Sequence, residues 1–149
     1  MKRLTRLTAL SCLLALCSAP LMANPVEDTA GHLAAIAQGN VPTLMHHYAD
    51  DAQLLWVGGP LDGHYSGRAA IQSLWEHFAS AQGKLALTSD TPAESANPRG
   101  STVFAKALYV GKNRIKVLHV LVFRNDQIVS EIWQVDPSLN VSQAALTGH

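Results

Sequence analysis

The hydrophobic periodicity of the chain is mostly helical before residue 85 and strand-like after it, and this order strongly constrains the fold. Apolar residues recur at spacings of three and four over residues 26–48 and again over residues 71–78. Four later segments are rich in Val, Ile, Leu and aromatic residues and are separated by turn signals. They cover residues 85–91, 102–110, 114–124 and 128–135. Helices followed by a run of strands predict an α+β fold with the helices packed on one face of a curved sheet.

Turn-forming residues divide the first helical segment. Gly39 and Asn40 interrupt its pattern, and Pro42 follows directly. We therefore expect two helices that meet at a turn, with Asn40 as the cap of the second helix and Pro42 in its first turn. The short turns between the last three strands predict an antiparallel meander.

An acidic pair links the second helix to a short strand. Asp50 and Asp51 resemble a catalytic pair, but we interpret them as the turn that ends this helix. Residues 53–57 are expected to form a strand, and the composition of residues 58–67 predicts a loop.

The first 23 residues have the pattern of a cleaved signal peptide. Basic residues at the start precede an apolar stretch over residues 7–16, and residues 19–23 form a plausible cleavage site before Asn24. The apolar stretch is shorter than the roughly 20 residues that a membrane-spanning helix needs. We therefore expect a periplasmic or secreted protein, with residues 24–137 as one domain and residues 138–149 as a flexible tail.

The composition of the mature chain excludes several kinds of site. Both cysteines, Cys12 and Cys17, lie in the predicted signal peptide, so no disulfide, thiol nucleophile or cysteine metal site is expected. Three of the eleven Lys and Arg residues also lie there, which leaves eight against eleven Asp and Glu. Because the mature chain has neither a basic stripe nor a second long apolar segment, we expect neither nucleic acid nor a membrane as a partner.

Two motifs carry a resemblance to a known family. Residues 48–56 read Tyr-Ala-Asp-Asp-Ala-Gln-Leu-Leu-Trp, and residues 65–78 contain Gly-Arg-Ala-Ala-Ile at the start of an amphipathic helix. This order is similar to the SnoaL-like, ketosteroid-isomerase-like branch of the nuclear-transport-factor-2-like superfamily, over roughly residues 26–137. The resemblance implies a cone-shaped curved sheet packed against about three helices, with one internal pocket. The loop over residues 58–67 is expected at the rim of that pocket.

The resemblance also implies where catalytic residues would lie. Ketosteroid isomerases use a carboxylate base and two buried hydrogen-bond donors. The position of the base corresponds to Trp56, which cannot abstract a proton, and the donor positions correspond to His32 and His119. Steroid isomerisation by that mechanism is therefore not expected. The superfamily contains isomerases, dehydratases, cyclases and hydrolases as well as many proteins without catalytic activity.

Three ionisable residues are candidates for chemistry. Strand alternation places His119 on the inner face between Val117 and Leu121, where it is either an acid–base group or a core histidine with one hydrogen bond. Glu131, in the last strand, either pairs with His119 across the hairpin or faces solvent, with Trp133 then packing against a second copy. His32 either lines the pocket or is solvated.

Bulky side chains suggest a flat or apolar ligand rather than a sugar phosphate, although core packing is the commoner role for each. Those expected to line the pocket are Tyr48, Trp56, Trp75, Phe78, Phe104, Leu121 and Trp133. The four histidines at positions 46, 47, 64 and 77 have no recognisable zinc spacing, and no cofactor motif is present. We expect no metal and no cofactor.

The opposite face of the segment 114–124 suggests a partner. Leu118, Val120 and Val122 make that face apolar, although the outer face of an antiparallel sheet is ordinarily wet. A homodimer through this face is therefore expected. Two hypotheses on function remain open. The chain either binds a small apolar or aromatic molecule without turnover, or is a proton-transfer enzyme in which Glu131 or His119 moves a proton and His32 polarises a carbonyl.

Overall fold

The computed structural model describes residues 24–142, so the predicted signal peptide lies outside the described residues. Within this range lie three helices: α1 (Pro25–Gln38), α2 (Val41–His46) and α3 (Arg68–Gln82). They accompany seven strands: β1 (Tyr48–Val57), β2 (Gly63–Ser66), β3 (Ala86–Ser89), β4 (Ala93–Asn97), β5 (Gly100–Val110), β6 (Arg114–Arg124) and β7 (Gln127–Val135).

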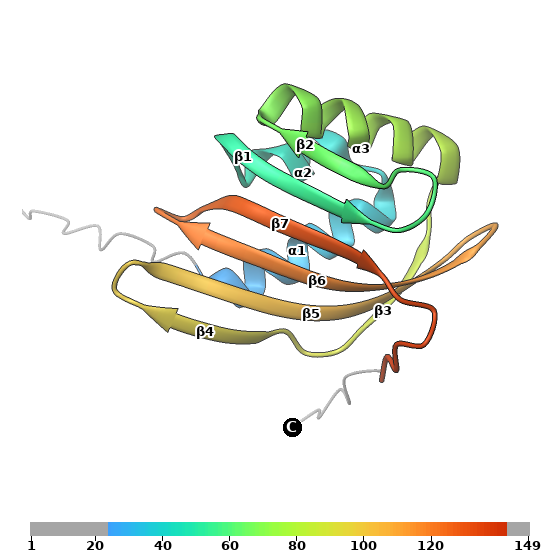
Figure 1. The fold of residues 1–149 in the computed structure, drawn as a ribbon. Helices are drawn as coiled ribbons and strands as arrows, with labels where there is room; N and C mark the ends of the chain where they lie inside the picture. Colours follow the sequence, from blue (N-terminus) through green and yellow to red (C-terminus); the bar gives the residue numbers. More distant parts are fainter. Residues whose placement is uncertain (1–23, 143–149) are drawn as a thin grey trace, which may run out of the picture.

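The strands form one curved, unclosed sheet. Its order is β2-β1-β7-β6-β5-β3, and β4 pairs with β5 beside β3. All neighbouring strands are antiparallel except β1 and β7, which run parallel. The three helices lie on one face of this sheet, and no helix between residues 24 and 142 covers the other face (Figure 1). The predicted α+β class and the antiparallel meander of β5, β6 and β7 are confirmed.

Side-chain caps explain the predicted break between the first two helices. Asn24 caps α1 by accepting hydrogen bonds from the backbone N–H groups of Val26 and Glu27. Gly39 ends this helix with φ at 66°, a left-handed conformation that favours glycine. The Asn40 side chain then accepts from the Thr43 N–H at 3.2 Å and starts α2, as predicted.

The region after α2 differs from the sequence prediction. Asp50 and Asp51 do not end a helix, because β1 already begins at Tyr48. Pairing with the last strand explains this early start: Tyr48 lies opposite Ile128. In addition, the Ile128 N–H donates to the His47 carbonyl at 2.7 Å. An isolated chain segment contains no signal for such a distant backbone partner.

Two strands were not predicted from the sequence. The segment 58–67 contains β2 within its predicted loop, and β4 lies where no strand pattern was seen. Every residue of β4 is exposed, and its polar sequence, Ala-Glu-Ser-Ala-Asn, does not alternate. Backbone hydrogen bonds to β5 hold this strand, so it leaves no hydrophobic signature.

Strand alternation predicted the inner face of β6 correctly, but a bulge interrupts the alternation of inward and outward side chains in β7. Val117, His119 and Leu121 are buried beneath the helices. Between Val122 and Phe123 the register with β7 shifts by one residue. As a result Ile128 is buried on the same side as Glu131 and Trp133, although simple alternation placed it on the opposite face.

The end of the described chain contacts the segment between β3 and β4. Both the backbone N–H and the hydroxyl of Ser142 donate to Asp90 Oδ1, at 2.7 and 3.2 Å. This contact lies within the segment predicted as a tail, of which residues 143–149 lie outside the described part. Among the described helices, none is long and apolar enough to cross a membrane.

Candidate functional site

A buried carboxylate joins α1, β1, β6 and β7 in the interior of the cone. Glu131 has no exposed surface, and neither do His32 and His119. His32 Nε2 lies 3.1 Å from Glu131 Oε2, and His119 Nδ1 lies 3.3 Å from Glu131 Oε1. The Tyr48 hydroxyl donates a hydrogen bond to Glu131 Oε2. The structure therefore brings together all three residues that the sequence singled out for chemistry, and adds a tyrosine to them.

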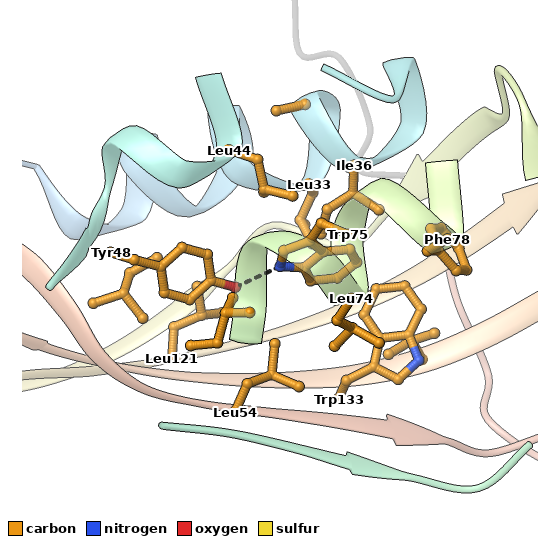
Figure 2. Packing of buried hydrophobic residues seen from close by; sticks show 14 of the residues in the cluster. Leu33, Ile36, Leu44, Tyr48, Leu54, Leu74, Trp75, Phe78, Leu121 and Trp133 are labelled. Carbon is orange, nitrogen blue, oxygen red and sulfur yellow. Dashed lines mark hydrogen bonds between the residues drawn. The ribbon is translucent and has the colours of Figure 1, made fainter. Parts of the chain in front are cut away.

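Two further side chains extend this cluster. The Tyr109 hydroxyl lies 3.1 Å from His119 Nε2. The Trp75 indole N–H donates to the Tyr48 hydroxyl at 3.1 Å, the contact drawn as a dashed line in Figure 2. We call these six residues the buried polar cluster: His32, Tyr48, Trp75, Tyr109, His119 and Glu131.

The hydrogen bonds of the cluster define its protonation. Burial alone raises the pKa of Glu131, but the electrostatic interaction with His32 and the hydrogen bonds from His119 and His32 outweigh it, so this pKa lies below its ordinary value. Burial lowers the pKa of His119 more than Glu131 raises it. His119 is thus a neutral ring that donates from Nδ1 and accepts from Tyr109 at Nε2.

The tyrosines of the cluster stay protonated. Burial raises the pKa of Tyr48 well above its ordinary value, and the adjacent Glu131 charge adds to the shift. Burial and the same charge raise the pKa of Tyr109. Glu131 therefore accepts from three donors and keeps its negative charge. A carboxylate engaged in this way is a weak base, because each donor stabilises the charged form that would have to take up a proton.

Aromatic rings surround one side of the cluster. Trp133 stacks on Trp56 with ring centroids 4.4 Å apart and on Tyr109 at 5.4 Å, both with planes inclined by 19°. The rings of Trp133 and His119 form a T-shaped pair with their centroids 4.8 Å apart. Trp75 and Phe78 of α3 complete the group, each in a T-shaped pair with Trp133 at centroid distances of 5.4 and 5.5 Å (Figure 2). These packed rings belong to the buried core.

A cavity of about 480 Å³ lies at one end of the sheet. It is bounded by the β1–β2 loop, the C-terminal half of α3, the β5–β6 turn and the end of β7. The residues that line it are Trp56, Gly58, Gly59, Pro60, Leu61, His77, Phe78, Ala81, Gln82, Asn113, Arg114, Ile115, Lys116, Val135 and Pro137. No member of the buried polar cluster lines this cavity. Trp56 and Phe78 are its buried aromatic surface.

Hydrogen bonds hold the loop that forms one wall of this cavity. The Trp56 indole N–H donates to the Gly58 carbonyl at 3.0 Å, and the Gly58 N–H donates to Asp62 Oδ2 at 2.7 Å. The Tyr65 hydroxyl donates to the Leu61 carbonyl at 2.8 Å. Gly58 adopts φ of 93°, which favours glycine. The wall is therefore shaped before any ligand arrives, and the predicted rim loop does line a cavity.

The residues predicted to line a pocket divide into three groups. Trp56 and Phe78 line the cavity. Phe104 does not, because β5 alternation points Val103 and Ala105 inward and leaves Phe104 44% exposed on the outer face. The other predicted lining residues pack in the buried core, which is the commoner role for such side chains. They are Tyr48, Trp75, Leu121 and Trp133.

Sequence reasoning missed some contributors. Tyr109 lies on the inner face of β5 with Ala105 and Ala107, and the alternation rule applied to this strand would have found it. Arg114 and Lys116 line the cavity although alternation assigns them to the face opposite Ile115. Both side chains border the cavity because the cavity surrounds the end of the strand. The hydrophobic periodicity of the sequence does not indicate such a position.

Comparison with known proteins agrees with this architecture. A family model described as a SnoaL-like domain matches residues 30–131 of the chain. No match was found among curated proteins.

Solved structures share the fold over most of the chain. An NTF2-like protein from Pseudomonas putida has a TM-score of 0.63 at 14% identity, over 82% of this chain and 92% of its own. A protein with a cystatin-like fold from Nostoc punctiforme has a TM-score of 0.62 at 17% identity, over 76% and 89%. A Catenulispora acidiphila protein with a ketosteroid isomerase-like fold, solved with trimethylamine, has a TM-score of 0.56 at 19% identity, over 75% and 87%. Likeness at these identities shows the fold alone.

Proposed function

This chain belongs to the SnoaL-like domain family, and we propose that it is an exported protein that binds a small apolar or aromatic molecule without turning it over. The observation that carries the proposal is the cavity of about 480 Å³ with Trp56 and Phe78 on its surface. Ligand pockets typically measure about 300–1,000 Å³ and are mostly apolar, so this cavity has the size and character of one.

Preorganisation supports binding at this place. The hydrogen bonds of Trp56, Asp62 and Tyr65 hold the loop in its observed shape. A ligand then enters a formed wall and does not have to order a loop, which lowers the entropic cost of binding.

The buried polar cluster fits a structural role in this function. From Glu131, hydrogen bonds lead through Tyr48 to Trp75, and His119 makes a T-shaped ring contact with Trp133. Trp133 in turn stacks on Trp56, which lines the cavity. The cluster thereby holds the aromatic rings in fixed positions. It supports the cavity surface from behind and does not touch a ligand bound there.

A cavity-filling variant tests the proposal. Ala81 is exposed on α3 and lines the cavity, whereas Ala69 is exposed on the same helix outside the lining. Native mass spectrometry on gently purified protein reports any retained molecule. We expect a reproducible extra mass on the natural protein and on Ala69→Trp, and its loss from Ala81→Trp, because the indole fills the cavity.

Retention that is equal in the two variants would place the ligand elsewhere. A protein that stays bare after incubation with aromatic and carbonyl metabolites would contradict the binding function itself. Thermal unfolding of both variants checks that each remains folded.

Proton transfer is the second candidate function, and the direct contact of a buried carboxylate with two imidazoles favours it. In that case Glu131 or His119 would move a proton while His32 polarises a carbonyl, which suits isomerisation, dehydration or cyclisation. Substrate would have to pass the stacked Trp56 and Trp133. Turnover of a carbonyl substrate that disappears in Glu131→Gln, with folding retained, would establish this candidate against the first.

We also propose a homodimer through the uncovered face of the sheet. One row of apolar residues crosses four strands there, with Phe104 paired to Val120, Val120 to Ile132 and Ile132 to Leu55. The ends of the row, Leu55 and Phe104, are 43% and 44% exposed. A twofold axis through the middle of the row would stack it on its own copy and bury both exposed ends.

A further inference from the structure

We propose that the ligand of this cavity is an amphipathic organic anion, with its apolar body against Trp56 and Phe78 and one carboxylate or sulfonate at Arg114 and Lys116. The inference rests on the proposed function, because it specifies the class of molecule that the same cavity takes.

The charged residues of the cavity lining all have the same sign. Arg114 and Lys116 lie at the start of β6, and no Asp or Glu between residues 24 and 142 lines the cavity. Arg114 is exposed and forms no ion pair with any residue between 24 and 142. Its guanidinium therefore presents free donors suited to a carboxylate or sulfonate.

The acidic residues next to the cavity are already engaged. Asp62 Oδ2 accepts the hydrogen bond from the Gly58 N–H that shapes the loop. Asp136 lies beside Lys116 along the β6–β7 pairing, and its Oδ1 accepts both the N–H and the hydroxyl of Ser138, at 2.9 and 2.6 Å. Asp136 offsets part of the Lys116 charge, so Arg114 is the principal anion contact.

The apolar lining residues determine the rest of the ligand. Trp56 and Phe78 are almost fully buried, and Leu61, Ile115 and Val135 are half-buried around them. An apolar body gains contact area on these five side chains. The cations lie on exposed or half-exposed residues, so the anionic head stays partly hydrated and avoids the full cost of burying a charge. A neutral molecule would leave the cations unused, and an organic cation would be repelled by them.

A matched pair of fluorescent probes tests the inference on the purified protein. Anilinonaphthalene sulfonate and phenylnaphthylamine share the same aromatic body, and only the first carries a negative charge. Each probe is titrated into the natural protein, the double variant Arg114→Gln/Lys116→Gln, the control Arg124→Gln at the other end of β6, and Ala81→Trp.

We expect the double variant to bind the sulfonate about tenfold more weakly and the neutral probe unchanged. Arg124→Gln should bind both probes as the natural protein does, and Ala81→Trp should bind neither. Equal binding of both probes to the natural protein, with no effect of the double variant, would overturn the anion preference and leave the binding function intact. Failure of both probes to bind, or binding that survives Ala81→Trp, would overturn the cavity as the site.

Discussion

Trp56 and Trp133 stack with their ring centroids 4.4 Å apart, and through this pair the cavity at the end of the sheet is connected to the buried carboxylate. Trp56 lines the cavity, and Trp133 makes a T-shaped ring contact with His119, which contacts Glu131. A change at the carboxylate is therefore expected to act on the cavity surface through packing, and on the stability of the whole domain.

Replacement of Glu131 by Gln is expected to lower the free energy of unfolding by about 3 kcal/mol. The substitution removes a buried charge that three donors face and turns one acceptor into a fourth donor. Urea unfolding measures the loss. Glu94→Gln, on the exposed strand β4, is the control and should change stability little. Equal stability of the two variants would show that the cluster does not stabilise the fold.

The two tyrosines of the cluster are expected to differ in importance. Tyr48→Phe removes a donor to the charged Glu131 and leaves the Trp75 N–H without its acceptor, so we expect a loss of about 2–3 kcal/mol. Tyr109→Phe removes a hydrogen bond to a neutral imidazole and should cost about 1 kcal/mol. Equilibrium unfolding of both variants under one set of conditions makes the comparison. A larger loss from Tyr109→Phe would contradict the assigned protonation.

Acid is expected to destabilise the protein in two stages. The pKa of His119 is lowered from 6.5, so the unfolded chain takes up the proton first and the stability due to neutral His119 is lost as the pH falls below 6.5. The pKa of Glu131 is lowered from 4.5, so its contribution is complete above 4.5 and is lost as the pH falls below that value. Unfolding free energies should be level from about pH 8 to pH 6.5, fall below pH 6.5, and fall further below pH 4.5 when the measurements extend to about pH 3.

A second histidine provides the control for this pH dependence. Burial lowers the pKa of His47 as well, but this half-buried residue lies outside the cluster. His47→Gln should therefore retain most of the acid sensitivity. A stability that is flat or rises toward pH 4 in the natural protein would refute the assigned charges.

The apolar row on the outer face is expected to join two copies of the chain. Light scattering during gel filtration should give the mass of a dimer for the natural protein. Val120→Lys places a charge in the middle of the row and should give the monomer mass, whereas Ala69→Lys on the helical side should remain dimeric. A natural protein that is monomeric at micromolar concentration would remove the dimer from consideration.

Export is expected to remove the first 23 residues. The intact mass of the protein recovered from the periplasm or the medium should correspond to a chain that begins at Asn24. Replacement of the basic residues Lys2, Arg3 and Arg6 by Gln should reduce export and leave the longer chain in the cytoplasm. Recovery of only the uncleaved chain, associated with membranes, would contradict cleavage.

Hydrophobic periodicity predicted the elements that bury apolar side chains. The helix α3 and the strands β5, β6 and β7 were found because one face of each packs in the core. The exposed strand β4 and the early start of β1 were missed, because backbone pairing with a distant strand holds them. The residue types within such a segment do not indicate which distant strand it pairs with.

The interior cluster was more predictable than the cavity. Alternation and the family resemblance together pointed to His32, His119 and Glu131, and the structure brings them into contact. The cavity is built from strand ends, a loop and a helix end, and its cations lie where periodicity places an outward face. Its composition depends on how the sheet curves, which is a property of the assembled fold.

The central place of the last strand has a consequence for how the chain folds. Strand β7 lies between β1 and β6, and it carries the carboxylate that contacts His32, a residue 99 positions earlier. During synthesis, α1, α2 and β1 therefore emerge without the neighbour that pairs with β1 and satisfies His32. Contacts so distant along the chain slow folding, because a large loop must close before they form. The N-terminal half is accordingly expected to stay open until residue 135 is available, a state that suits passage through a translocation channel.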